Sequence, residues 1–138
     1  MAEIKKITVS GKRKESIAKA TIYSGTGIVR INKKPIDTFP FLRRLILMEP
    51  LRLSETLLKD AAKSFDIDVN VQSGGAEAQI EASRLAIARA ILAFTKSTEL
   101  KKAFVAYDRS LLVADVRRKE QRKPVDSKAR ARRQKSYR

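Results

Sequence analysis

The sequence predicts an α+β fold in which helices cover one face of a small β-sheet. Residues 66–72 alternate polar and apolar side chains, the period-two pattern of a strand with one buried and one solvent-facing side. Residues 76–94 carry an apolar stripe at helical spacing. The chain has 138 residues, a length typical of one hydrophobic core. Strand-like and helical segments packed around one core give this fold class.

Three strands are expected near the N-terminus. Residues 4–10 form the first, and the basic stretch Gly-Lys-Arg-Lys at 11–14 separates it from the next. Residues 18–23 and 28–32 are apolar and β-branched, and they flank residues 24–27, which contain two glycines. Because glycine adopts the positive φ of a tight reversal, we expect these two strands to form a hairpin.

Two helical segments are expected between the hairpin and the strand at 66–72. Apolar side chains recur at helical spacing between residues 39 and 46, and again between Leu53 and residue 65. Pro50 fits the start of the second segment, because proline fixes φ near its helical value. A last amphipathic turn or two is expected at residues 100–107.

The longest helix is expected from about residue 76 to 94. Its opposite face carries Glu77, Glu81 and Arg84. Residues 73–75, Ser-Gly-Gly, lie just before it, where free backbone N–H groups can receive a phosphate. A plain turn from strand to helix explains the same residues, and both readings stay open. The apolar stripe and the small residues facing it are Ile80, Ile87, Ile91 and Phe94, with Ala82, Ala86 and Ala90.

The composition points to a polyanionic partner. Lys and Arg number 31 against 15 Asp and Glu, for a formal charge of +16. Histidine and cysteine are both absent, which removes disulfides, thiolate or imidazole metal sites and the catalysts built on those side chains. No cofactor is expected and catalysis is not supported. No stretch reaches the roughly 18 apolar residues of a spanning helix, so a soluble, cytoplasmic protein is expected.

The charge is concentrated at the C-terminus, which divides the chain into a globular domain, 1–116, and a tail, 117–138. The tail carries 11 basic and two acidic residues, so its 22 residues hold +9. Val125 and the Pro124 ring are its only aliphatic side chains larger than a methyl group. Burying so little apolar surface does not offset a backbone entropy cost of roughly 1 to 2 kcal/mol per residue. We therefore predict that the tail becomes ordered when it binds RNA. The alternative is that it stays in solvent and serves only to keep the protein soluble.

A second basic cluster lies in the domain. Lys12, Arg13, Lys14 and Lys19 match the charge of the tail and suggest a second set of phosphate contacts, against the alternative of an ordinary solvated loop. Lys33 and Lys34 extend the possibility more weakly. Asp108 and Asp115 lack a paired carboxylate at recognisable spacing, and we interpret them as caps or salt-bridge partners.

Four blocks in order resemble ribosomal protein S-nine of the small subunit, in its archaeal and eukaryotic-like form, over essentially the whole chain. The blocks are Gly-Lys-Arg-Lys at 11–14 with Ala18-Lys19-Ala20; Gly25-Thr26-Gly27 leading to Ile31-Asn32-Lys33-Lys34-Pro35; Gly74-Gly75 with Ala78-Gln79, Ala82, Ala86 and Ala88-Arg89-Ala90-Ile91; and the basic ending from 128 to 138. Ser73 stands where the family usually has glycine, and Lys19 where it often has arginine.

The resemblance implies a domain like the second domain of ribosomal protein S-five, with a left-handed β-α-β crossover. It implies a structural protein of the small ribosomal subunit, with neighbouring ribosomal proteins of the subunit head as further partners. Implied contacts with peptidyl-site tRNA, near its anticodon stem-loop, are Lys135, Ser136, Tyr137 and Arg138. Implied contacts with ribosomal RNA of the head are Lys12, Arg13, Lys14, Lys19, Arg117, Arg118, Lys119, Arg122, Lys123, Lys128, Arg130, Arg132 and Arg133.

Two rival functions stay open on the residues alone. A basic DNA-compacting protein would shift duplex DNA in preference to structured ribosomal RNA. An enzyme of RNA or nucleotide metabolism would need a positioned acid–base pair, which this sequence does not display.

Overall fold

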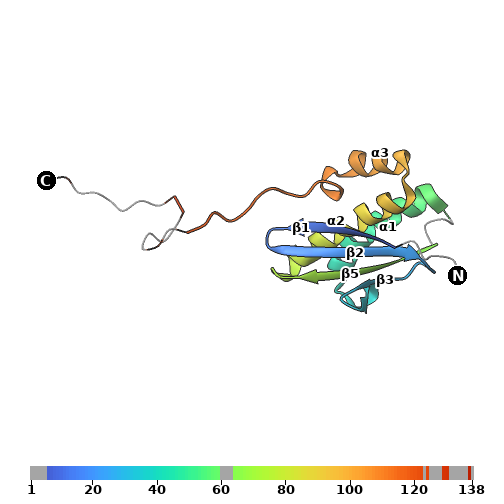
Figure 1. Ribbon diagram of the computed structural model, residues 1–138, viewed down its shortest axis with the longest axis horizontal. Coiled ribbons are helices and arrows are strands. Elements are labelled where there is room, and N and C mark those ends of the chain that lie inside the picture. Colours follow the sequence, from blue (N-terminus) through green and yellow to red (C-terminus); the bar gives the residue numbers. More distant parts are fainter. Residues whose placement is uncertain (1–5, 60–63, 123, 125–128, 131–136, 138) are drawn as a thin grey trace.

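The computed structural model describes residues 6–59, 64–122, 124, 129–130 and 137 (Figure 1). It confirms the predicted α+β class. In chain order the elements of these residues are β1 Ile7–Arg13, β2 Ser16–Ser24, β3 Val29–Ile31, β4 Lys34–Pro35, the 3-10 turn η1 Ile36–Thr38, α1 Phe41–Leu58, β5 Phe65–Gln72, α2 Ala76–Thr95, α3 Thr98–Tyr107 and the 3-10 turn η3 Arg109–Leu111.

One sheet contains all the described strands, in the order β1-β2-β5-β3-β4. β2 pairs antiparallel with β1 and with β5, and β3 pairs antiparallel with β4. β3 and β5 are parallel, and α1 lies in the connection between them. These elements form a β-α-β unit, whose left-handed crossover stays a prediction.

The core lies on one face of the sheet. Alternate residues of β2 and β5 are buried, and Ile22, Phe65 and Ile67 are almost fully enclosed. α2 packs against β1, β2 and β5, α1 lies beside α2, and α3 contacts α1 (Figure 1). The intervening side chains of β2 and β5 stay at the opposite, open face. The predicted strand at 66–72 and the helices at 76–94 and 100–107 are confirmed.

The predicted hairpin of residues 18–23 and 28–32 is wrong, because β5 lies between β2 and β3. The loop between them instead wraps around the start of β5. Asp66 Oδ1 accepts hydrogen bonds from the backbone N–H groups of Thr26, Gly27 and Ile28, at 2.7, 2.9 and 2.9 Å. A carboxylate that binds three successive N–H groups holds the loop open, so β3 reaches the far side of β5.

The basic stretch at 11–14 belongs to a hairpin and does not separate two strands. β1 continues to Arg13, and Arg13 pairs with Ser16 of β2. Only Lys14 and Glu15 form the turn, and Lys14 has a φ of 52°. A two-residue turn with a positive φ fits the twist of an antiparallel pair.

The two helical segments predicted on either side of Pro50 are one helix, α1. Leu47, Pro50 and Ser54 are its buried residues, so the proline ring lies within the buried stripe. Proline removes one backbone donor, and the burial of its ring offsets part of that cost. Phe65, assigned by its spacing to the second helix, is the first residue of β5.

Candidate nucleic-acid interface

The four basic residues predicted to act together in the N-terminal region are divided by the β1–β2 hairpin. Lys12 and Arg13 are adjacent in β1, so their side chains leave the strand on opposite faces. Arg13 lies on the side of α2, whereas Lys12 and Lys19 are exposed on the open face. Lys14 occupies the turn. The alternation of side chains along the strand at residues 7–13 is the sequence signal that could have assigned Lys12 and Arg13 to opposite faces of the sheet.

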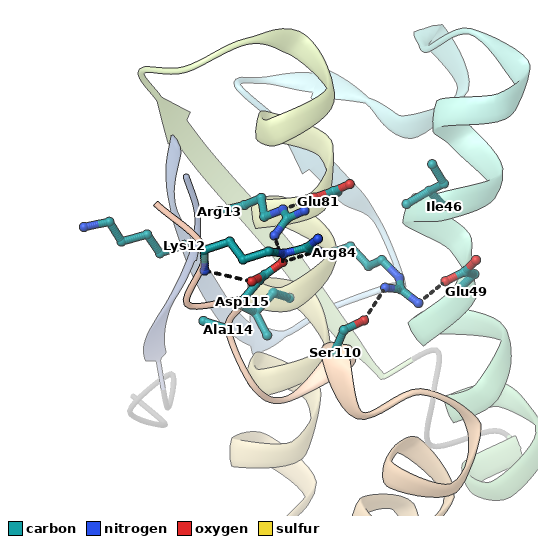
Figure 2. A pocket seen from close by; sticks show the side chains of 11 residues that line it. Lys12, Arg13, Ile46, Glu49, Glu81, Arg84, Ser110, Ala114 and Asp115 are labelled. Atoms are coloured by element: carbon teal, nitrogen blue, oxygen red, sulfur yellow. Dashed lines mark hydrogen bonds and ion pairs between the residues drawn. The ribbon is translucent and has the colours of Figure 1, made fainter. Parts of the chain in front are cut away.

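The guanidinium of Arg13 lies between two carboxylates (Figure 2). Its Nε donates to Glu81 of α2, and its Nη1 donates to Asp115. The side chain of Arg13 is 18% exposed, and the hydrogen bond to Asp115 raises its pKa. Arg13 therefore joins β1 both to α2 and to the start of the C-terminal segment.

Asp115 also binds an arginine of its own segment. The backbone N–H of Arg117 donates to Asp115 Oδ1 at 2.9 Å, and Arg117 Nε donates to Oδ2 at 2.8 Å. Hydrogen bonds from Arg117, supported by Arg13, hold the pKa of Asp115 well below its usual range. We call Arg13, Glu81, Asp115 and Arg117 the tail-root cluster; they line a cavity of about 310 Å³.

Two arginines of α2 hold the residues that precede this cluster. Arg84 Nη2 lies 2.5 Å from Glu49 Oε2 of α1 and 2.9 Å from Asp108 Oδ2. Arg89 donates to the backbone oxygens of Ser10, at 2.8 Å, and Leu112, at 2.9 Å. Arg84 was expected on the helix face opposite the apolar stripe, yet its side chain is only 15% exposed. Its ion pairs with α1 and with the cap of η3 explain this burial.

The prediction that Asp108 and Asp115 are caps or salt-bridge partners is confirmed. Asp108 Oδ1 accepts the backbone N–H of Ser110 at 2.8 Å and so caps η3. The hydrogen bond from the Ser110 hydroxyl lowers the pKa of Asp108, and Arg84 acts in the same direction. Both carboxylates are therefore used to hold the C-terminal segment on the domain.

A basic cavity of about 450 Å³ lies at the end of the sheet where β1 turns into β2. The strand-to-helix turn at residues 73–75 forms one wall. Gly74 has a φ of 71°, and a Cβ there would lie 2.1 Å from Ser16 Oγ, so only glycine fits. The cavity is lined by Lys14, Glu15, Gly74, Gly75, Ala78, Arg117, Arg118 and Lys119. We call this region the basic end.

The open face of the sheet holds a second group of cations. Lys19 is one predicted member, and Arg30 is a member that the sequence analysis missed. Lys33, noted there as a weaker possibility, lies in the same cavity of about 540 Å³. Arg30 could have been found from its place at the exposed centre of the strand Val29–Ile31.

The described part of the tail runs outward from the basic end (Figure 1). Arg117, Arg118, Lys119 and Arg122 are exposed. Arg130 pairs with Glu120, and Tyr137 is 88% exposed. The other predicted contact residues of the tail lie outside the described residues: Lys123, Lys128, Arg132, Arg133, Lys135, Ser136 and Arg138.

Two kinds of feature are absent from the described part of the chain. None of its helices is both long and apolar enough to cross a membrane. No group of three or more Asp or Glu side chains within it could hold a metal ion.

Comparisons with known proteins agree with one another. The family described as "Ribosomal protein S9/S16" matches residues 11–138. A "Small ribosomal subunit protein uS9" of Methanococcus vannielii is 46% identical over 138 residues, covering 98% of this chain and 100% of that protein. Proteins with the same name are 48% identical over 129 residues in Picrophilus torridus, covering 93% and 94%, and 45% identical over 138 residues in Methanococcus maripaludis, covering 98% and 100%.

Proposed function

The chain belongs to the Ribosomal protein S9/S16 family, and we propose on that premise that it binds ribosomal RNA of the small-subunit head and reaches peptidyl-site tRNA with its C-terminal residues. The general function follows from the family: the chain is a structural, non-enzymatic protein of the small ribosomal subunit. Its partners there are ribosomal RNA and neighbouring ribosomal proteins.

The basic end is the observation that carries the RNA-binding proposal. Lys14, Arg118 and Lys119 are exposed around one cavity, and no carboxylate of the described residues lies within ion-pair distance of them. Cations without an internal partner are free to neutralise phosphates, and each contact releases condensed counterions. This charge continues directly into the tail, where residues 117–138 hold 11 basic side chains.

We assign residues 1–116 to the globular domain and residues 117–138 to the RNA-binding tail. Arg13 has a different part in this proposal from its neighbours, because its guanidinium is occupied by Glu81 and Asp115. It positions the root of the tail beside the basic end, while Lys12, Lys14 and Lys19 face solvent and contact phosphate. Arg117, which pairs with Asp115 but keeps 81% of its side chain exposed, and Arg122 extend the same contacts along the tail.

The tail is long enough to reach a distant site. Twenty-two extended residues span on the order of 70 Å at about 3.3 Å each. We propose that Lys135 and Arg138 contact phosphates of the anticodon stem-loop in the peptidyl site. Ser136 and Tyr137 can hydrogen-bond or stack beside them, as exposed RNA bases and backbones allow.

Sedimentation tests the assignment to the subunit. The full-length chain is expected to travel with small subunits at low salt and to leave them at high salt, since phosphate contacts weaken steeply with ionic strength. A protein making 6 to 10 phosphate contacts loses roughly a thousandfold to a hundred-thousandfold in affinity between 50 and 200 mM salt. A chain that stays out of ribosomal fractions at low salt would contradict the proposal.

Deletion of residues 135–138 tests the role of the terminus. Subunits that carry the shortened chain are expected to assemble normally and to bind tRNA more weakly in the peptidyl site. Filter binding of labelled tRNA to purified subunits measures this. The control is a chain with Arg52→Gln and Lys101→Gln, which loses two cations that are exposed elsewhere on the domain. Equal tRNA affinity in the deletion and wild-type subunits would remove the role given to the terminus.

A further inference from the structure

Three basic side chains gather on the open face of the sheet. Lys19 is on β2, Arg30 is on β3, and Lys33 follows β3. All three are exposed, and no carboxylate of the described residues lies within ion-pair distance of any of them. The basic end does not include them, so they form a separate charged surface, which we call the sheet-face site.

Among the described residues that line this site, one is acidic and is engaged in a hydrogen bond. Asp68 of β5 accepts a hydrogen bond from the hydroxyl of Tyr23 at 2.9 Å, and this bond raises the pKa of the tyrosine. Asp66, the other acid on this side of β5, is turned to the N–H groups of the loop at 26–28. Accepting a hydrogen bond does not cancel the charge of a carboxylate, and Arg30 also interacts with Asp66 through its charge. Three cations still outnumber the one acid that lines the site, so the sheet-face site has a net positive charge.

The cations lie on either side of a polar floor. β5 lies between β2 and β3, and Asn70 of β5 is opposite Lys19 in the register. Neighbouring strands are about 4.8 Å apart, so the two basic rims are separated by roughly 10 Å. Asn70 is exposed, and Thr8 and Thr21 hydroxyls lie 3.1 Å from each other at the same cavity. Its volume of about 540 Å³ leaves room for a polar chain along β5.

Side chains suited to stacking or to protein docking are scarce on this face. Tyr23 is its one aromatic residue among the described strands, and its hydroxyl is held by Asp68. Ile17, 42% exposed, is the largest apolar group that β2 presents there. Base-stacking surfaces and the centres of protein interfaces both depend on exposed aromatic anchors. The chemistry of this site therefore favours a sugar–phosphate backbone over splayed bases or another protein.

We propose that the sheet-face site is a second RNA-binding surface, on which Lys19, Arg30 and Lys33 hold the sugar–phosphate backbone of ribosomal RNA. The proposal rests on the proposed function for the identity of the RNA. Phosphates on either side of β5 contact the two basic rims. The Asn70 amide, between them, can donate to or accept from a ribose 2′-hydroxyl, a group that distinguishes RNA from DNA.

Directed hydroxyl-radical cleavage tests the position of the RNA. The chain has no cysteine, so Asn70→Cys gives one attachment point for tethered iron–EDTA on the sheet-face site, and Lys101→Cys gives a control point on α3. Each full-length variant replaces the wild-type chain in purified small subunits. The Asn70→Cys variant is expected to cleave one contiguous stretch of ribosomal RNA, distinct from any cleaved by the control.

Two outcomes of that experiment would overturn the proposal. Subunits with tethered iron at Asn70→Cys could show no cleavage of RNA there, or the same cysteine could cross-link to a neighbouring ribosomal protein with no RNA cleavage. In both outcomes the variant still sediments with the small subunit. Failure of the proposed function differs, because then neither variant would enter the subunit.

Charge removal gives an independent measurement on the free protein. The triple variant Lys19→Gln, Arg30→Gln and Lys33→Gln loses two lysines and one arginine from the site. Its matched control is Arg52→Gln, Lys101→Gln and Lys102→Gln, the same exposed residue types on α1 and α3. With transcribed small-subunit RNA as probe, log affinity decreases with log salt concentration. In the site variant this decrease should be less steep, its slope smaller in magnitude by about 2. Equal slopes for the two triple variants would overturn the proposal.

Discussion

Adjacent basic residues have different roles in this chain because backbone geometry sends their side chains in different directions. Lys12 is exposed at the open face, whereas Arg13 is inserted between Glu81 and Asp115. Arg84 and Arg89 are also used within the protein, where they bind the C-terminal segment to α2. The planar fork of arginine suits such multidentate contacts. The count of 31 basic residues therefore overstates the number of cations that are available to RNA.

Gly11 is the residue at which packing leaves no room for a side chain. A Cβ there would lie 2.4 Å from the backbone oxygen of Ala82 and 2.7 Å from the backbone nitrogen of Ala86. Gly11→Ala is expected to push β1 from α2 and to lower the free energy of unfolding by about 1 to 3 kcal/mol. Urea unfolding measures this change.

Gly75→Ala is the matched control for that substitution. Gly75 has no atom within 4 Å of a built Cβ and has a φ of -89°. Its substitution by alanine should lower the free energy of unfolding by less than about 1 kcal/mol, the range typical of a change at a helix N-cap. Equal losses for the two variants would show that the contact between β1 and α2 is looser than described.

Asp66 gives the fold a pH dependence of predictable sign. Backbone hydrogen bonds, the largest from Ile28, lower the pKa of its carboxyl in the folded state. Because the pKa of Asp66 is lower in the folded protein than in the unfolded chain, its ionised carboxylate stabilises the fold at pH values above the ordinary carboxyl pKa. That stabilisation is lost as the pH falls through the pKa of the folded protein. Asp66→Asn should therefore reduce the free energy of unfolding at pH 7 by about 1 kcal/mol.

The difference between wild type and Asp66→Asn should shrink as the pH falls below about 4, where the Asp66 carboxyl of the unfolded chain begins to protonate. Denaturant unfolding at a series of pH values measures it. Asp37→Asn, which removes an exposed ion pair with Arg44, serves as the control and should cost less than about 0.5 kcal/mol. A difference for Asp66→Asn that stays constant down to pH 2 would contradict the role given to its charge.

At the scale of elements, α2 organises both the core and the exit of the tail. One side of it packs on the sheet, and Glu81, Arg84 and Arg89 hold β1, η3 and Leu112. The helix thus fixes the point from which the C-terminal segment leaves the domain. Residues of three sequence regions, near 13, 81 and 115, meet in the tail-root cluster.

The tail-root cluster is expected to order residues 113–117. Asp115→Asn removes the charge that Arg13 and Arg117 share, so the amide of Arg117, which donates to Asp115 Oδ1, should exchange its hydrogen faster. Hydrogen exchange followed by mass spectrometry measures the segment. Glu77→Gln breaks an exposed pair with Arg43 and should leave the segment unchanged. Identical exchange in wild type and Asp115→Asn would show that the cluster does not hold the tail.

At the scale of the whole molecule, the domain is expected to fold without the end of the tail. Beyond Lys119 the one ion pair among the described residues joins Arg130 to Glu120, within the tail itself. A chain that ends at Lys119 keeps the tail-root cluster, so its free energy of unfolding should stay within about 0.5 kcal/mol of the full chain.

The same truncation removes eight basic and two acidic residues, and RNA affinity at low salt should fall steeply. Thermal unfolding and filter binding to small-subunit RNA measure the two effects separately. A large loss of stability would show that the distal tail packs on the domain. Unchanged RNA affinity would show that the distal tail does not contact RNA.

Local patterns determined the fold class and several elements. The alternation of β5 and the apolar stripe of α2 depend on side chains a few residues apart, and the structure confirms both. The charge of the tail and the four ordered blocks indicated the family, and the comparisons confirm it. Asp108 and Asp115 were interpreted correctly because isolated acids near basic segments have few other roles.

Pairing between distant residues was decided only in the tertiary structure. Residues 18–23 and 28–32 have the composition of a hairpin, yet Asp66, about 40 residues away, binds the loop between them and β5 separates the strands. Arg13 belongs to a basic run in the sequence, and only the folded chain brings Glu81 and Asp115 to its guanidinium. Short-range periodicity records which face of an element is buried. Which partner covers that face, and which charges it neutralises, depends on contacts that no local pattern contains.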